Sequence, residues 1–140
     1  MINAYLLAGI AMVLWGVAPI FGKMGLGGTH PLAALTIRSV VTSIILLITV
    51  TAMGKWGSVT GIAAKDALYI ILEGLFAALL GQLAYYYALK YGEVGRVAPV
   101  VAAFPLVALI LGIIFFGEEL TLTKIAAAAL IFSGIVLLKF

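Results

Sequence analysis

Two charged residues lie well inside long apolar segments, and they are the first candidates for chemistry. Glu73 is seven residues into the segment Ala67–Leu89, and Arg38 is seven residues into Leu32–Met53. At 1.5 Å per residue, each would lie about 10 Å along a helix. Charges at that depth in a membrane are costly and often contact ions or solutes. We therefore expect both side chains to line a pathway for a solute or a coupling ion such as a proton.

A structural alternative is open for each of these charges. Glu73 could lie near the membrane surface with its carboxylate in water, and Arg38 could extend to the lipid headgroups or pair with a carboxylate. Thr42 and Thr49 share the helical face of Arg38, because four and eleven residues return a helix to nearly the same angle. A basic residue on such a hydroxyl-lined face suits an anionic group.

Three other side chains are candidates for lining a pathway: Trp15 in the first apolar segment, and Gln82 and Tyr86 in the third. Gln82 is nine residues from Glu73, about 180° around an α-helix, so the sequence predicts that these two side chains face different surroundings. Tyr86 is one of three consecutive tyrosines, which could instead anchor the helix end at the membrane surface.

Three prolines are predicted to bend the apolar helices, since proline lacks the amide that continues the hydrogen-bond ladder. Pro19 lies in the first segment, and Pro99 and Pro105 lie in the fourth. Bends of this kind would give the helices flexibility. Packing alone would also account for all three.

The sequence lacks the residues that several common kinds of catalytic or binding site require. The chain has no cysteine and a single histidine, which excludes thiolate chemistry and gives no metal-ligand cluster. The glycines at 25–28 are not followed by Lys-Ser/Thr, so they form no phosphate-binding loop. Glu118 and Glu119 lie in a short link and are expected to cap the next helix. We therefore predict a protein that is not an enzyme and carries no metal or cofactor.

The composition is that of a membrane protein. Of 140 residues, 66% are hydrophobic and 9% are charged, against roughly 45–50% apolar in an ordinary soluble domain. The eight scattered basic residues form no nucleic-acid-binding stripe. Because lipid offers the backbone no hydrogen-bond partner, segments of about 20 apolar residues must be helices. Five segments qualify: Ala4–Gly22, Leu32–Met53, Ala67–Leu89, Ala98–Gly117 and Thr121–Phe140.

Lysine and arginine differ little between the two predicted sides of the membrane. The side of the Gly54–Asp66 loop holds three of them, counting Lys124, and the opposite side holds five. This weak positive-inside bias favours an N-terminus outside the cell. A weak bias permits both orientations in one membrane, although a chain this short gives poor statistics.

Several short motifs, in their order, resemble the EamA-type repeat of the drug/metabolite transporter superfamily. They are Leu14-Trp15-Gly16, Pro31 followed by Arg38, Ala84–Pro99, and Phe104–Leu138 with its FFGEEL sequence. Arg38 stands where the family has its basic residue in the second span. The resemblance covers nearly the whole chain and implies an all-α membrane domain over residues 1–140. Its five transmembrane helices would form one repeat of a ten-helix inverted-repeat transporter in a prokaryotic-type inner membrane.

Members of that superfamily commonly carry two such repeats in one chain, and this sequence contains one. The resemblance therefore implies a homodimer, antiparallel if both orientations are inserted, or a dimer with a paralogous five-helix partner. It further implies secondary transport, in the export direction, of small organic metabolites or drugs. Two alternatives stay open: a subunit of a lipid-linked sugar flippase, and a membrane partner or assembly subunit that does not transport.

The depths of the two charges within the predicted spans suggest how two copies would meet. Arg38 and Glu73 approach from opposite membrane faces, so a hydrocarbon core of about 30 Å would separate them by about 10 Å in one chain. In an antiparallel dimer, Arg38 of one copy and Glu73 of the other would lie at the same depth. We expect an ion pair between subunits if this geometry holds.

Overall fold

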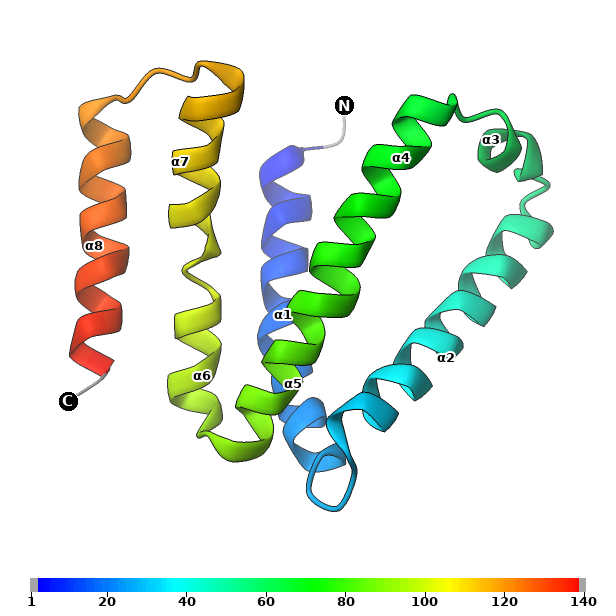
Figure 1. Cartoon of the computed structure of the whole chain (residues 1–140), viewed down its shortest axis with the longest axis horizontal. Coiled ribbons are helices and arrows are strands. Elements are labelled where there is room, and N and C mark those ends of the chain that lie inside the picture. Colours follow the sequence, from blue (N-terminus) through cyan, green and yellow to red (C-terminus); the bar gives the residue numbers. More distant parts are fainter. Residues whose placement is uncertain (1–2, 139–140) are drawn as a thin grey trace. The chain divides into compact units, whose positions relative to one another are not determined.

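The computed structural model describes residues 3–138, and the regular structure in that range is helical (Figure 1). The elements are α1 (Ala4–Gly25), α2 (Pro31–Ala52), α3 (Trp56–Thr60), α4 (Ala64–Glu73), the π-helix η1 (Gly74–Gly81), α5 (Gln82–Tyr91), α6 (Val94–Val101), α7 (Phe104–Phe116) and α8 (Leu122–Leu138). They pack as two compact units, one ending at Tyr91 and the other beginning at Gly92.

The expectation of an all-helical membrane protein is confirmed, with some shifts in the helix ends. Four helical segments are long and apolar enough to cross a membrane: Ala4–Gly25, Pro31–Ala52, Ala64–Tyr91 and Val94–Phe116. The third is 28 residues long and extends beyond the predicted Ala67–Leu89 at both ends. The fifth expected span is the shorter apolar helix α8, whose described part has 17 residues. Residues 139 and 140 of that expectation lie outside the described range.

Local sequence signals account for several helix ends. The Asn3 side chain accepts a hydrogen bond from the Tyr5 amide at 3.0 Å and caps α1. His30 Nδ1 accepts from the Leu32 amide at 3.3 Å, and Pro31 occupies the first turn of α2, where its missing N–H costs nothing. At the end of α7, Gly117 adopts a left-handed conformation with φ +63°, which glycine tolerates without strain.

The buried core of the first unit lies at one end of its helices. Among the described residues, the buried large apolar side chains are Leu26, Leu35 and Leu89. They come from the α1–α2 connection, the start of α2 and the end of α5, and Figure 1 shows these three parts meeting while α2 and α4 diverge away from that end. A Cβ at Gly22 would lie 3.5 Å from Leu89 Cδ1, so Leu89 packs closely against α1.

Two lysines strengthen the same end of the unit. The Lys23 ammonium on α1 donates to the carbonyl oxygens of Leu89 at 2.6 Å and Lys90 at 3.3 Å. These carbonyls belong to the last turn of α5, which has no further helical amides to bond them. A cation there also interacts favourably with the helix dipole. Lys90 in turn donates to the Thr29 carbonyl at 3.0 Å, which ties α5 to the α1–α2 connection.

In the second unit, Glu118 connects the two helices of a hairpin. After Gly117 the chain turns, and α8 runs back along α7 toward α6, which it contacts (Figure 1). The Glu118 carboxylate lies against Gly112, where a Cβ would come within 3.2 Å of it, and it pairs with the Lys124 ammonium at 2.9 Å. The cap of α8 is Thr121, whose hydroxyl accepts from the Lys124 amide at 3.3 Å. The expected capping role of Glu118 is therefore corrected to a bridge between α7 and α8.

The lysine cap of α5 predicts a stability difference between two lysine substitutions. Lys23→Met removes a charged donor from two carbonyls, so the free energy of unfolding in detergent should fall by roughly 1.5–3 kcal/mol. Lys55→Met is the matched control, since the described part of the chain gives the Lys55 side chain no hydrogen bond or ion pair. Equal unfolding midpoints for the two variants would contradict the role assigned to Lys23.

Candidate functional site

The structure brings together two of the residues singled out by the sequence. Arg38 on α2 lies over the ring of Tyr86 on α5, with 5.9 Å between the guanidinium carbon and the ring centroid. This distance is within the range of a cation–π interaction. The contact occurs where α2 and α5 approach each other (Figure 1). A face shared by α2 and α5 is therefore the candidate site.

Gln82 belongs to the same face of α5 as Tyr86. The two residues are four apart in a regular α-helical segment, which makes them neighbours on the helix surface, and both are half-buried. Across the described residues, the Arg38 side chain forms no hydrogen bond and no ion pair, and its cation–π partner is Tyr86. The site thus offers a guanidinium, a phenol and an amide.

The hydroxyl-lined face expected around Arg38 does not supply hydrogen-bond donors. Thr42 donates its hydroxyl hydrogen to the Arg38 carbonyl at 2.8 Å, and Thr49 donates to the Ile45 carbonyl at 2.8 Å. Such bonds to the preceding helical turn are common for threonine inside helices. Because each hydroxyl has one hydrogen, only its lone pairs face outward. Of Arg38, Thr42 and Thr49 on α2, only Arg38 therefore has side-chain donors to offer an anion.

Glu73 lies apart from this site. Tyr86 is level with Arg38 and thirteen residues along the third span from Glu73, so Arg38 and Glu73 are separated by roughly 20 Å at 1.5 Å per residue. This is about twice the separation that the sequence suggested. Glu73 also lies closer to the middle of Ala64–Tyr91 than Tyr86 does. Inverting a second copy about that middle would therefore not bring its Glu73 level with Arg38.

A π-helix separates Glu73 from Gln82. Glu73 immediately precedes η1 and Gln82 immediately follows it. In a π-helix the amide of residue i+5 bonds the carbonyl of residue i, so each turn holds more residues than an α-helical turn. The expected 180° between the two side chains is therefore wrong, because it assumed 100° per residue. Short π segments in α-helices are frequent at functional sites.

Gly81 makes the π-helical turn sterically feasible. A Cβ at Gly81 would lie 2.9 Å from the carbonyl oxygen of Phe76, five residues earlier. This oxygen belongs to the backbone and cannot move without disturbing the turn. At Gly74, the first residue of the same π-helix, a Cβ would meet nothing within 4 Å. Apart from this glycine, no feature of the sequence distinguishes η1 from the α-helix around it.

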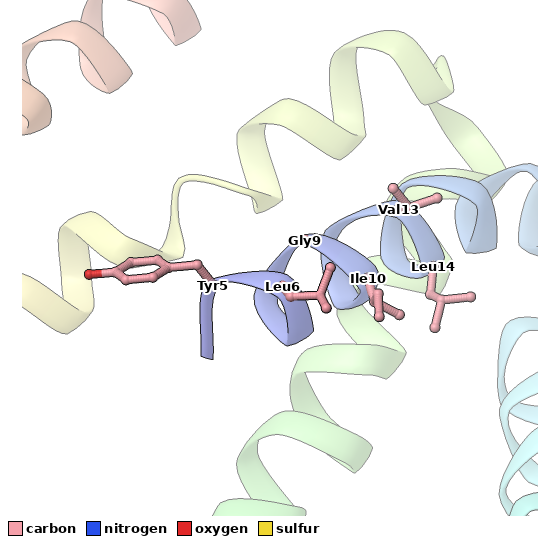
Figure 2. A pocket seen from close by; sticks show the side chains of 6 residues that line it. All are labelled: Tyr5, Leu6, Gly9, Ile10, Val13 and Leu14. Atoms are coloured by element: carbon pink, nitrogen blue, oxygen red, sulfur yellow. The ribbon is translucent and has the colours of Figure 1, made fainter. Parts of the chain in front are cut away.

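The first helix contributes an apolar surface rather than a polar site. Trp15 is 70% exposed, and Pro19 is buried within α1, which continues without interruption from Ala4 to Gly25. An open hollow of about 400 Å³ lies along α1, and Figure 2 shows its lining side chains on successive turns of that helix. They are Tyr5, Leu6, Gly9, Ile10, Val13 and Leu14. The hollow offers a solute no charged group, and Trp15 is not among its lining residues.

The fourth span is divided between its two prolines. Pro99 lies inside α6, and Pro105 lies in the first turn of α7. The α-helix is interrupted at Ala102–Ala103, between these prolines. Since Pro105 has no amide hydrogen, it cannot bond the carbonyl of Val101 and continue the ladder. The interruption gives this span a local joint in the backbone.

Residues that the sequence analysis did not single out gather at the buried end of the first unit. A smaller hollow of about 170 Å³ is lined by Lys23, Leu26, Gly27, Lys90 and Tyr91. Nearby, the His30 and Tyr87 rings meet edge to face with centroids 5.9 Å apart, and 3.4 Å separates His30 Nε2 from the Tyr87 hydroxyl. In the sequence, only the placement of Lys23 and Lys90 on the same predicted side of the membrane pointed to this cluster. No group of three potential metal ligands occurs among residues 3–138.

Apolar helices of membrane-spanning length, with a few polar side chains on facing helices, define a helical integral membrane protein. The chain belongs to the EamA-like transporter family, whose pattern matches residues 2–140. The resemblance seen in the sequence motifs is therefore confirmed.

Relatives of similar and of greater length are found. A Sinorhizobium protein named as an uncharacterized transporter in the cobO 3′ region is 34% identical over 119 residues, which are 85% of this chain and 84% of the relative. An uncharacterized protein of Methanocaldococcus jannaschii is 30% identical over 137 residues, covering 98% and 96%. An uncharacterized transporter of Archaeoglobus fulgidus is 36% identical over 66 residues, covering 47% of this chain and 24% of that protein. No solved structure matches significantly.

The π-helix predicts opposite effects of two Gly→Ala substitutions. Alanine at an unhindered helical glycine should stabilise the fold by up to about 1 kcal/mol, so Gly74→Ala should raise the thermal unfolding midpoint or leave it unchanged. Gly81→Ala should lower the midpoint, because its Cβ would collide with the Phe76 carbonyl oxygen. If both variants unfolded at or above the wild-type temperature, the third span would be α-helical throughout.

Proposed function

We propose that the chain is a secondary transporter that exports small organic metabolites or drugs and functions as a dimer of five-helix repeats. Membership of the EamA-like transporter family supports transport as the activity. The observation that carries the dimer is a comparison of lengths. The Archaeoglobus relative is roughly twice as long as this chain, because the 66 matched residues are only 24% of it. The longer relative is long enough to contain two five-helix repeats, and a second copy of this chain would supply the second repeat.

The exposed surface of the helices supports association in the membrane. In each of the four spans, at most 11% of the residues in the most apolar stretch are buried. Side chains as large as Trp15, Phe76 and Phe115 are at least 65% exposed. Lipid covers part of such a surface, and the rest is available to a second repeat. Because Arg38 and Glu73 lie in spans and lack ion-pair partners among the described residues, their faces are the ones that fit a polar pathway.

The two repeats would be related by inversion across the membrane. Inverted repeats that enclose a central site are a recurring transporter architecture. The small difference in lysine and arginine between the two sides allows one sequence to insert both ways. A homodimer is therefore the simplest assembly, and a paralogous five-helix chain would fill the same place. We assign it to the inner membrane of a prokaryotic-type cell.

Two backbone features support alternating access. The joint at Ala102–Ala103 lets α6 and α7 change their relative direction, and the π-helix η1 lets the face of α5 rotate relative to α4. Pro99 and Pro105 flank the first, and Glu73 and Gln82 flank the second. In this proposal Arg38, Glu73, Gln82 and Tyr86 contact the solute or a coupling ion. Trp15 lines the pathway only where a second repeat covers α1.

Solute flux into liposomes that contain this chain alone tests the proposal. Radiolabelled amino acids, carboxylic acids, nucleosides and cationic dyes would be offered to proteoliposomes of increasing protein density. We expect flux of at least one class, with an initial rate that rises as the square of density while copies are sparse, since two must meet.

The other outcomes of the flux experiment contradict the proposal in different ways. A rate linear in density from the lowest density would exclude the dimer. Movement of lipid-linked sugars alone would indicate a flippase subunit. No movement of any solute class would indicate a partner or assembly subunit. Protein with the Lys55→Met substitution should give the same flux as the wild type, because Lys55 lies outside the spans and outside the proposed pathway.

A further inference from the structure

We propose that Arg38, held against the ring of Tyr86, binds the carboxylate of the transported solute, so that the substrates are small organic anions. This inference deepens the proposed function and rests on it. It depends on the contact between α2 and α5 and on the hydrogen-bonding capacity that this contact leaves available.

The geometry of the guanidinium supports a carboxylate ligand. A guanidinium carries five N–H donors in one plane. Its carbon lies over the Tyr86 ring, 5.9 Å from the ring centroid. Within residues 3–138 no acceptor takes a hydrogen bond from the Arg38 guanidinium, so its N–H groups are available to a ligand. A carboxylate fits two of them with parallel hydrogen bonds, which lysine cannot form.

The charge balance around Arg38 favours the same ligand. The ion pairs in the described part of the chain are Glu93–Arg96 and Glu118–Lys124, and neither involves the first unit. Glu73, which is in that unit, lies thirteen residues along the third span from Tyr86. An arginine within a membrane span is costly unless an anion or water accompanies it. A bound carboxylate would supply the missing negative charge.

The neighbouring polar groups restrict what else can bind there. Thr42 presents only lone pairs, because its hydrogen is given to the Arg38 carbonyl, so it offers a second anion no further donor. Gln82 lies one turn from Tyr86 and carries an amide N–H₂ that can donate to a ligand on this face. One monovalent carboxylate matches one guanidinium and one amide better than a multiply charged anion does.

Binding is tested without transport, with benzoate as the probe and benzamide as its neutral counterpart. Full-length protein in phosphatidylcholine nanodiscs would be heated with each compound, and the shift of the unfolding midpoint gives the affinity. We expect benzoate to stabilise the wild type more than benzamide does. The difference should vanish in Arg38→Gln, and affinity should fall about tenfold in Arg38→Lys, which keeps the charge but loses the planar fork.

Further variants keep the test decisive if Arg38→Gln does not fold. Tyr86→Leu should bind benzoate more weakly than the wild type, because it removes the ring that contacts the guanidinium. Arg96→Gln is the matched control, since Arg96 pairs with Glu93 at 3.1 Å and lies in the other unit. Equal benzoate effects in the wild type, Arg38→Gln and Tyr86→Leu would overturn the proposal, as would the absence of any benzoate effect in the wild type.

Two competing sources of negative charge give their own results. If phosphatidylglycerol in the nanodiscs abolished the benzoate effect, Arg38 would bind lipid phosphate and the proposal would fail. If Glu73→Gln markedly strengthened benzoate binding, Arg38 would be paired with Glu73 of a second copy, and the proposal would also fail. Solute flux without Arg38-dependent benzoate binding would overturn this inference alone. Benzoate binding without any flux would overturn only the proposed function.

Discussion

In a bilayer, each backbone amide and carbonyl must find its partner within the protein, and most features of this chain depend on that constraint. Long uninterrupted helices satisfy this constraint along their length. At the helix ends, side chains bond the remaining backbone groups: Asn3 caps α1, His30 caps α2, and Lys23 caps α5. The regular α-helical pattern changes at η1 and at Ala102–Ala103. These are the places where a small change of backbone bonding costs least, and hence where motion is expected.

The packing of the first unit is concentrated at one end of its helices. Leu26, Leu35 and Leu89 form the buried core there, and the lysine bonds of α1 and α5 reinforce it. Away from that end α2 and α4 diverge, so their facing surfaces remain for other contacts (Figure 1). This packing keeps Arg38 and Tyr86 in contact, close to the buried leucines. Its remaining surface depends on lipid or on a second repeat.

The helices were predictable because long apolar runs leave a chain in lipid no other structure, and the charged candidates were predictable because charges are rare there. The Arg38–Tyr86 contact was not predictable, since it depends on how α2 and α5 pack and rotate. The π-helix was not predictable either, because its residues Gly74–Gly81 are as apolar as those of an α-helix. It corrected the relation between Glu73 and Gln82, and the level of Tyr86 corrected the depth of Arg38 relative to Glu73.

The central claim is that two inverted copies make one transporter, and labelling of single cysteines tests it directly. The chain has no cysteine, and Gly28 and Ser58 are exposed positions beyond opposite ends of α2. Each would be replaced by cysteine separately, and intact cells would be treated with an impermeant thiol reagent. The account predicts that both variants are labelled in about half of their molecules, since a dual orientation places each site outside in one copy. Labelling of only one site would show a fixed orientation and would contradict the inverted homodimer.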